Sequence, residues 1–321
     1  MGKTRTKVAV IGASGIGKHH AKWWALEGAE VCAFAGTSEA SVARTRQVLA
    51  EMFGFDGRGY ADVGDMLRRE RPDVVDVCSP PACHFEHVQA ALAAGCDVLC
   101  EKPFVYDAEL SPDSLLTQAR TLAASAQSAG RRLGMCSQYH AAVRCCRELL
   151  AEHTGAQTVE RCCGRLSSPA KGDAPDLDAT WLDLAPHMLA AVQALAPDGA
   201  IESDSLRKSF AGWQAAASFR VSAPGGVGMD CEIVTGRTLP GSGASHVREF
   251  ELNGVRFVIG GGKDAQGAYC AQILAPWGTF ERPDALRQTI REFLCGETQL
   301  PAPAAVTNLS WLLEIQRRPR E

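Results

Sequence analysis

The sequence predicts an α/β protein in which a doubly wound parallel sheet is followed by an α+β domain with an antiparallel sheet. Through about residue 140, short apolar runs alternate with helical segments of roughly 10–15 residues, the order that a parallel sheet covered on both faces requires. Beyond that point the extended segments become longer, with helices on one side. The length of 321 residues exceeds what one core usually supports, so we expect two domains, 1–138 and 139–321.

Each element of the first domain has its own signal. The run KVAVIG at 7–12 is apolar and β-branched and stops at glycines, while Thr37 and Ser38 offer N-caps to a helix. Two prolines at 80–81 end a later strand, and Gly95 lies just past the next helix. The expected strands are 7–12, 30–36, 73–81, 96–101 and 131–138, and the expected helices are 15–26, 38–52, 84–95 and 111–130.

The second domain contains longer extended segments and then helices. The clearest local signal is Asn253-Gly254, the preferred two-residue hairpin turn, which lies between alternating strands. The segment 167–178 is the most loop-like part of the chain. The expected strands are 158–166, 209–221, 225–235 and 246–261, and the expected helices are 141–152, 283–296 and 304–318.

Composition and charge exclude several classes of protein. With 46% hydrophobic and 22% charged residues, the chain resembles an ordinary globular protein. A net charge of −4 without a lysine-arginine block argues against a nucleic-acid partner. No apolar run approaches the roughly 18 residues that span a bilayer, and the run behind the basic N-terminus is too short for a signal peptide. We therefore expect a cytoplasmic protein with no membrane partner.

The thirteen cysteines include no CxxC pair. His84 and His87 lie near Cys78 and Cys83, but their spacing fits no zinc template. We expect no metal, and we expect the thiols to be buried and reduced.

The segment GASGIG at 12–17 follows the first strand and opens the first helix, which is the context that a dinucleotide fingerprint needs. Glycine lets the backbone approach a pyrophosphate, which then lies on the helix N-terminus, as in a Rossmann domain. Serine replaces the usual middle glycine. The predicted cofactor contacts from this turn are Gly12, Ser14, Gly15, Ile16 and Gly17.

The end of the second strand should contact the ribose of the cofactor. An NAD site usually has an acid there, but this chain has Gly36, Thr37 and Ser38, and the nearest acid is Glu39 beyond the turn. The missing carboxylate favours NADP over NAD, with the two hydroxyls and Arg44 as donors to a 2′-phosphate. The same hydroxyls could act only as helix caps, or they could do both.

Three motifs occur in order: VAVIGASGIGKHH, DVCSPPACHFEHVQAALAAGCDVLCEKP and WLDLAPHML. Together they resemble the Gfo/Idh/MocA family, the group of glucose-fructose oxidoreductase and inositol dehydrogenase, over essentially the whole chain. His20 also matches the histidine of the family's first helix. The resemblance implies a Rossmann domain, then an α+β domain whose large, mostly antiparallel open sheet often forms a homo-oligomer interface. It also implies a nicotinamide cofactor and hydride transfer with a sugar or cyclitol carbon.

The segment LCEKPF at 99–104 places Glu101 and Lys102 at the end of a strand, where ligands bind in open parallel sheets. A solvated lysine is the alternative for this motif considered alone. The resemblance implies that Lys102 acts in catalysis and that Glu101 lines the cofactor site. The further cofactor contacts predicted from the middle motif are Ser79, Pro80 and His84.

Hydride transfer to a carbonyl leaves an alkoxide that must be protonated, and the reverse reaction needs a base. Histidine suits this role, and an ammonium stabilises the oxyanion. In WLDLAPHML we expect Pro186 in the first turn of a helix, with Asp183 near the cap and His187 on the first turn. Either residue could be purely structural. With the resemblance, we predict His187 as general acid/base, Lys102 as polarising cation, and Asp183 as the partner that holds substrate or tunes them.

Two departures from the family pattern concern the substrate. Ala185 stands where the family often has glycine, and Gln138-Tyr139-His140 stands where it often has Asn-Tyr/Gln-Arg. The substrate-pocket candidates are Tyr139, His140 and Trp181, of which Trp181 could equally belong to the core.

The leading hypothesis is an NAD(P)-dependent dehydrogenase or reductase acting on a sugar, polyol or sugar-derived carbonyl. A dihydrodiol, imine or tetrapyrrole reductase on the same scaffold is a second hypothesis. A cofactor-binding regulatory protein without turnover is a third. The presence of Lys102, Asp183 and His187 argues against the third, because a sensor needs the cofactor site but not the proton-transfer groups.

Overall fold

The computed structural model describes residues 5–170, 172–222, 228–239, 246–265 and 269–319. The chain forms two compact units, each described separately below. The first contains Met1–Cys136 and Leu286–Val306, and the second contains Ser137–Ala285 and Thr307–Glu321. The sequence placed all of 139–321 in one domain, whereas Leu286–Val306 returns to the first unit.

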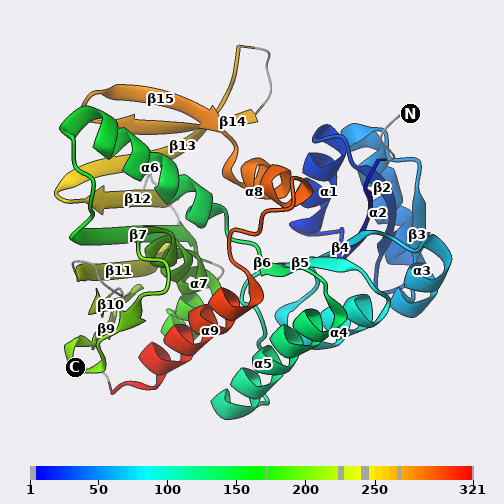
Figure 1. Cartoon of the computed structure of the whole chain (residues 1–321), viewed down its shortest axis with the longest axis horizontal. Coiled ribbons are helices and arrows are strands. Elements are labelled where there is room, and N and C mark those ends of the chain that lie inside the picture. The colour runs from blue at the N-terminus through cyan, green and yellow to red at the C-terminus, as the bar shows by residue number, and fades with distance from the viewer. Residues whose placement is uncertain (1–4, 171, 223–227, 240–245, 266–268, 320–321) are drawn as a thin grey trace. The chain divides into compact units, whose positions relative to one another are not determined.

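A parallel sheet forms the centre of the first unit. Its described strands follow the order β3-β2-β1-β4-β5-β6, and every neighbouring pair is parallel (Figure 1). The order reverses at β1, so the topological switch point, where open α/β sheets bind ligands, lies between β1 and β4. The strands are β1 (Lys7–Ile11), β2 (Glu30–Ala35), β3 (Arg58–Tyr60), β4 (Val74–Val77), β5 (Asp97–Cys100) and β6 (Leu133–Met135).

Helices cover both faces of this sheet, which confirms the doubly wound prediction. In Figure 1, α1 and α8 lie on one face and α4 and α5 on the other. The sequence analysis missed α3 and β3, because β3 has three residues and α3 buries only Met66 and Leu67. The helices are α1 (Gly17–Leu26), α2 (Glu39–Phe53), α3 (Val63–Glu70), α4 (His84–Ala93), α5 (Pro112–Ala129) and α8 (Ala285–Leu294).

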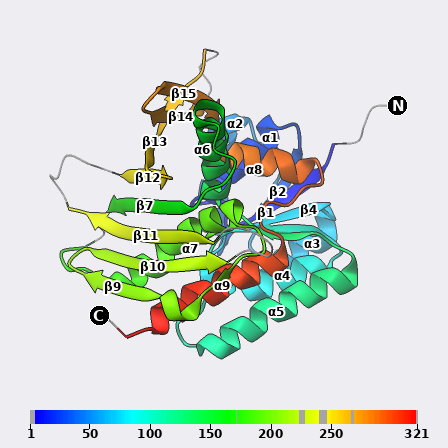
Figure 2. The same ribbon diagram turned by 60° about the vertical axis from the view of Figure 1, so that its left-hand side comes forward.

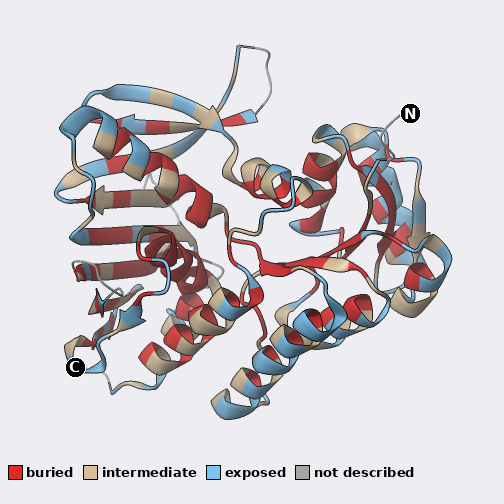
Figure 3. Ribbon diagram, viewed as in Figure 1, coloured by how far each residue is buried: buried red, intermediate tan, exposed pale blue. Residues whose placement is uncertain are grey.

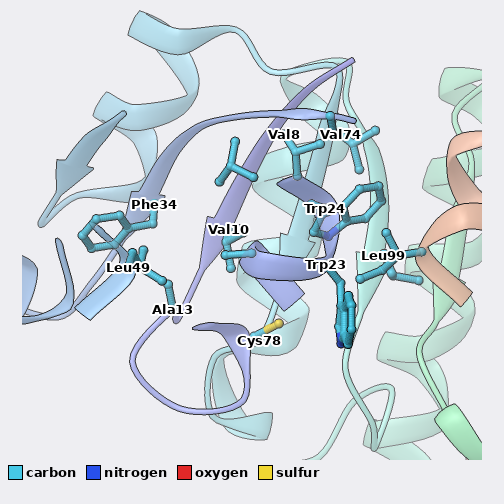
Figure 4. Packing of buried hydrophobic residues seen from close by; sticks show 14 of the residues in the cluster. Val8, Val10, Ala13, Trp23, Trp24, Phe34, Leu49, Val74, Cys78 and Leu99 are labelled. Carbon is cyan, nitrogen blue, oxygen red and sulfur yellow. The ribbon is translucent and has the colours of Figure 1, made fainter. Parts of the chain in front are cut away.

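The core of the first unit packs the apolar face of α1 against the sheet and α8. Val8, Trp24 and Leu99 are almost completely buried and lie close together in Figure 4. The Trp24 ring meets Phe293 of α8 edge to face, with ring centroids 6.1 Å apart. Burying one such side chain contributes about 1.5–3 kcal/mol, so α8 is an integral part of this core.

The second unit contains a large sheet in the order β15-β14-β13-β12-β7-β11-β10-β8, with β9 paired to β10. Its described ladders are antiparallel except for the parallel pair β7–β11, as the prediction of a mostly antiparallel sheet requires. The strands are β7 (Arg161–Pro169), β8 (Ala200–Ile201), β9 (Arg207–Ala211), β10 (Gln214–Ser222), β11 (Met229–Thr238), β12 (Val247–Leu252), β13 (Val255–Lys263), β14 (Tyr269–Ala275) and β15 (Gly278–Pro283).

Helices pack on one face of this sheet, as Figure 2 shows for α6 (Gln138–Thr154) and α7 (Leu177–Leu195). The last helix, α9 (Ala302–Arg317), joins this unit from Thr307 onward. Along β10, every second residue is buried, so one face of the sheet carries the core (Figure 3). The predicted hairpin is confirmed: Asn253 and Gly254 join β12 to β13 with φ of 51° and 82°, both positive as a type I′ turn requires.

Three expectations for the second unit need correction. The segment 167–178 is not simply a loop, because its first residues continue β7 and α7 begins at Leu177 with Asp176 as N-cap. The strand pair β14–β15 was not expected. Pro186 lies inside α7 rather than in its first turn. In addition, residues 225–227 of one predicted strand lie outside the described residues.

Among the helices in the described part of the chain, none combines the length and the apolar character needed to cross a membrane.

Candidate functional site

Four loops of the first unit leave the sheet at its carboxyl edge. Gly12 follows β1, Gly36 follows β2, Cys78 and Ser79 follow β4, and Glu101 follows β5. The loops after β1 and β4 come very close, because a Cβ atom added to Gly12 would lie 2.6 Å from the carbonyl oxygen of Cys78. Most of the cofactor residues predicted from the sequence therefore lie at the edge where parallel sheets bind ligands.

The glycine turn has the backbone that its sequence requires. Gly12 has a φ of +87°, in the left-handed region that favours glycine. A Cβ atom on Gly17 would lie 2.6 Å from the carbonyl oxygen of Gly12, so the third glycine allows α1 to pack closely on the turn. Ser14, Gly15 and Ile16 are exposed between them. The turn thus presents its backbone to a ligand.

The N-terminus of α1 has no side-chain cap and no acidic residue in its first turn. By contrast, α2 is capped by Ser38 and α5 by Ser111, whose hydroxyls accept backbone N–H groups. The first N–H groups of a helix need an acceptor, and their partial positive charge suits an anion. The turn and the uncapped helix together fit the pyrophosphate of a dinucleotide.

The loop after β2 presents small hydroxyl side chains. The Gly36 N–H donates to the Tyr60 carbonyl at 2.9 Å, and Thr37 and Ser38 are exposed. The Ser38 Oγ accepts the Ser41 N–H at 3.2 Å, so its capping role is confirmed. A serine hydroxyl that accepts this bond still carries a proton that it can donate to a phosphate.

The Glu101–Pro103 turn holds the predicted lysine. The Lys102–Pro103 peptide bond is cis, and the Lys102 N–H donates to Glu101 Oε2 at 3.2 Å. Both residues are partly buried. Lys102 therefore lies at the carboxyl end of β5 with its backbone fixed by the side chain that precedes it.

His84 has a different position from the one expected of a cofactor contact. It is fully buried, with Nδ1 2.9 Å from the Pro103 carbonyl oxygen and Nε2 2.8 Å from the Ser79 carbonyl oxygen. Burial lowers the pKa of His84. The side chain thus joins the loops that follow β4 and β5, and it contributes to the site by holding their backbones.

A buried cluster that the sequence analysis left unassigned lies next to the Glu101–Pro103 turn. His20 of α1 has Nδ1 2.9 Å from Asp76 Oδ2 and Nε2 3.1 Å from Glu101 Oε1. The indole N–H of Trp24 donates to the same Asp76 oxygen at 2.5 Å. One sequence signal could have found this cluster: Asp76 is a charged residue within the otherwise apolar strand VVDV.

His187 is held by residues from another helix of the second unit. Its Nδ1 lies 3.0 Å from the Ser137 Oγ, and the Tyr139 ring lies 5.1 Å from its own ring. Ser137 occupies the N-cap position of α6 but makes no capping bond with its side chain. Burial raises the pKa of Tyr139 to about 12, so its phenol is neutral at physiological pH. The sequence analysis missed Ser137, whose hydroxyl faces the histidine.

Asp183 lies one turn before His187 on the same face of α7, which preserves the predicted spacing although neither residue lies near the helix start. Arg237 of β11 donates to Asp183 Oδ2 at 2.8 Å and also to the Ser168 hydroxyl. The Asp183 side chain is 37% exposed. The carboxylate is therefore accessible, and its charge is compensated by the guanidinium.

Of the substrate-pocket candidates in α6 and α7, Trp181 belongs to the core. It is 0% exposed, its indole N–H donates to the Leu312 carbonyl at 3.2 Å, and its ring contacts Phe210. The ring is thus used for packing, so of the two alternatives stated for Trp181, pocket or core, the structure has it in the core. Tyr139 and His140 are mostly buried in the first turn of α6.

Comparison with known proteins gives a consistent family. The model of the Gfo/Idh/MocA family, described as "Oxidoreductase family, NAD-binding Rossmann fold", matches residues 6–136. D-glucoside 3-dehydrogenase from Escherichia coli (strain K12) is 39% identical over 132 residues, 40% of this chain and 33% of that protein. Inositol 2-dehydrogenase from Klebsiella pneumoniae (strain 342) is 31% identical over 180 residues, 54% of this chain and 50% of that protein. The chain thus matches between a third and a half of the length of these curated relatives.

The fold itself is shared over nearly the whole chain. The solved structure of UDP-N-acetylglucosamine 3-dehydrogenase from Acidithiobacillus ferrooxidans superimposes with a TM-score of 0.71, covering 98% of this chain and 97% of that one at 17% identity.

Proposed function

Because residues 6–136 match the Gfo/Idh/MocA oxidoreductase family, we propose that the chain is an NAD(P)-dependent dehydrogenase or reductase that transfers a hydride between nicotinamide and a sugar, polyol or sugar-derived carbonyl. The observation that carries the proposal is the carboxyl edge of the first sheet. There the glycine turn, the uncapped α1 and the Glu101–Lys102 pair follow strands β1 and β5. A bound nicotinamide supplies the hydride acceptor or donor in this reaction.

Each residue then has a distinct role. The backbone from Gly12 to Gly17 and the N-terminus of α1 bind the pyrophosphate. Lys102 stabilises the negative charge that develops on the reacting oxygen, as a placed ammonium does. His187 takes the proton of that oxygen in oxidation and returns it in reduction. Asp183, paired with Arg237, hydrogen-bonds the substrate or tunes the histidine.

The loop after β2 supports a preference for NADP. No carboxylate ends this strand, so nothing at Gly36–Ser38 repels a 2′-phosphate. The exposed hydroxyls of Thr37 and Ser38 can donate to it, and Arg44 is exposed on α2. Glu39, the first residue of α2, is the acid that could instead favour NAD.

The test is a fluorescence titration of the purified protein with NADPH and NADH, after a check for cofactor already bound. We expect at least tenfold tighter binding of NADPH, and we expect Ser38→Asp to reverse the order by repelling the 2′-phosphate. Tighter NADH binding by the unaltered protein would contradict the NADP preference but retain the dehydrogenase. Binding of neither nucleotide, with none bound beforehand, would contradict the proposed function.

The names of the curated relatives favour a secondary alcohol of a sugar or cyclitol as substrate, and a panel of such alcohols with NADP⁺ and NAD⁺ tests this. Dihydrodiol, imine and tetrapyrrole substrates form the opposing arm of the same panel. Turnover in that arm alone would transfer the assignment to the second hypothesis. No turnover in either arm, despite cofactor binding, would favour the regulatory protein.

We also propose that the protein acts as a homo-oligomer through the large sheet and in a reducing compartment such as the cytoplasm. The proposal is supported by Tyr269 and Leu274 of β14, which are about half exposed and give a second copy apolar side chains to cover. Light scattering on the eluted protein should give a dimer or tetramer. A monomer would contradict the proposed homo-oligomer.

The proposed reducing compartment is supported by the cysteines. All thirteen are free thiols, and eleven are buried.

A further inference from the structure

The cluster around His20 gives this side chain an unusual set of neighbours. His20 and Asp76 are both 0% exposed, and Glu101 is 13% exposed. The imidazole lies between two carboxylates that come from the ends of adjacent parallel strands, β4 and β5. One of these carboxylates belongs to the residue directly before Lys102.

The number of N–H donors that the neighbours of this imidazole can accept indicates its charge. An ionised carboxylate can only accept, and a neutral imidazole has a single N–H to donate. Both ring nitrogens face carboxylate oxygens, at 2.9 Å for Nδ1 and 3.1 Å for Nε2. When both carboxylates are ionised, only the imidazolium can donate to both, so the geometry favours a doubly protonated ring.

The electrostatic surroundings agree with this geometry. Burial is the largest single effect and lowers the pKa of His20, but the charge and hydrogen-bond contributions of its neighbours, led by Asp76, together leave the pKa well above the ordinary value. Within the described part of the chain, the titratable groups next to His20 include Asp76, Glu101 and the thiols of Cys78 and Cys136, and the Cys100 thiol also lies near the two carboxylates. Burial raises the pKa of all three thiols, so they stay neutral and the cationic ring balances carboxylates.

The cluster also connects to the backbone of the proposed site. Glu101 uses Oε1 for His20 and Oε2 for the Lys102 N–H, so one carboxylate joins the ring to the turn. Asp76 is fixed in turn by the indole of Trp24. A continuous chain of hydrogen bonds therefore runs from the core of the first unit to the Lys102 backbone.

We propose that His20 is a positioning residue: as a buried imidazolium it ties the Glu101 carboxylate to Asp76 and thereby fixes the turn that carries Lys102. The role in catalysis rests on the proposed function, whereas the charge state of His20 does not. Without the cation, two like-charged carboxylates face each other, and their repulsion favours uptake of a proton by one of them.

The direct test is ¹⁵N NMR of the histidine rings, with the His20 signals identified by their loss in His20→Gln. We expect both ring nitrogens of His20 to be protonated at pH 7, where an unperturbed histidine with a pKa of about 6.5 is mostly neutral. A neutral ring at pH 7 would overturn the proposal. So would a metal-bound ring with stoichiometric zinc, because the ion would then replace the proton. This measurement needs neither cofactor nor substrate, so it is independent of the proposed function.

The second test reads the effect on the turn. In His20→Gln, we expect the Lys102 amide to exchange its hydrogen at least tenfold faster. We also expect kcat/KM to fall about tenfold at pH 7 and to gain a new ionisation on the acid side. Adding Asp76→Asn should remove that ionisation, because the facing charges are then gone. Lys22→Gln, on the same helix but beyond its first turn, is the matched control and should leave both readouts unchanged.

Outcomes of the second test separate the two proposals. Unchanged Lys102 exchange and an unchanged pH profile in His20→Gln would overturn the positioning role even if turnover were confirmed. Faster exchange in a protein that binds no nicotinamide nucleotide would support the positioning of the turn and contradict the proposed function. If His20→Gln fails to fold, His20→Gln with Asp76→Asn gives the same exchange comparison.

Discussion

The two units present their histidines in opposite ways. In the first, His20 reaches from α1 to carboxylates at the ends of β4 and β5, and charge dominates its surroundings. In the second, His187 lies inside α7, and the observed neighbours of its ring are the hydroxyl of Ser137 and the ring of Tyr139. The first arrangement is suited to holding a proton permanently. The second places a hydroxyl rather than a carboxylate at Nδ1 of the ring, so the partner observed there carries no charge that would hold a proton.

The difference shows that sheet topology brings together the residues around His20, whereas helix packing brings together those around His187. The ends of parallel strands always meet at one edge, so charged residues placed there come together whatever the loops do. Residues on a helix face meet only those partners that packing brings to them. We therefore expect substitutions in the first unit to alter turnover or stability by removing a charge, and substitutions around His187 to alter turnover by impairing proton transfer.

The largest effect on turnover is expected from Lys102→Ala, which removes a charge from the first unit. Turnover should fall by at least about 100-fold, because the developing oxyanion loses its cation, while NADPH binding stays within about threefold. Steady-state rates and the fluorescence titration measure the two quantities. Lys263→Ala in β13 is the control and should leave both unchanged. Near-normal turnover in Lys102→Ala would remove this residue from the mechanism.

His187→Gln should lower kcat by about 100-fold and flatten its pH dependence near the range where histidine titrates, around pH 6.5 for an unperturbed side chain. A pH–rate profile of the variant against the parent protein makes the measurement. Ser137→Ala is the companion variant: it keeps the imidazole but removes the hydroxyl at Nδ1, so the pH dependence should persist at a smaller loss of kcat. An unchanged profile in His187→Gln would place the acid/base role elsewhere.

A smaller effect is expected from Glu27 in the first unit. Its partners are arginines, whereas the partner of Glu101 is His20. Burial alone would raise the pKa of Glu27, but its hydrogen bonds to Arg291 and Arg287 of α8 outweigh this and lower it. Stabilisation from a lowered pKa is present above the unfolded value of about 4.3 and is lost as the pH falls through the folded value.

Glu27→Gln should therefore lower the free energy of unfolding by about 1–2 kcal/mol at pH 7, and the difference should vanish toward pH 3. Urea denaturation at several pH values measures this. Glu30→Gln, at an exposed position in β2, should change it very little. A pH-independent difference for Glu27→Gln would mean that packing, not charge, joins α8 to the first unit.

Much of the first unit could be predicted because its signals are local. The glycine turn, the prolines after β4 and the Glu-Lys-Pro segment each mark the end of a strand, and parallel topology then brings these ends to one edge. The Asn253-Gly254 hairpin is equally local, because both positive φ angles suit those two residues. The family resemblance added the cofactor and the type of reaction.

What could not be predicted depends on long-range packing. Pro186 suggested a helix start, yet α7 begins nine residues earlier at Leu177, since its apolar face and the Asp176 cap stabilise the helix through the proline. A tryptophan such as Trp181 is compatible with a pocket or with a core, and only its packing against Phe210 in the structure shows that it belongs to the core. The contact between Ser137 and His187 joins residues 50 positions apart.

The return of Leu286–Val306 to the first unit has a consequence for synthesis on the ribosome. A terminal domain usually folds as soon as it has emerged, at elongation rates of roughly 5–20 residues per second. Here the packing around Trp24 cannot be completed until Phe293 has been synthesised, and Phe293 follows the whole insert Ser137–Ala285. For several seconds the nascent chain therefore exposes the part of α1 that Phe293 later covers.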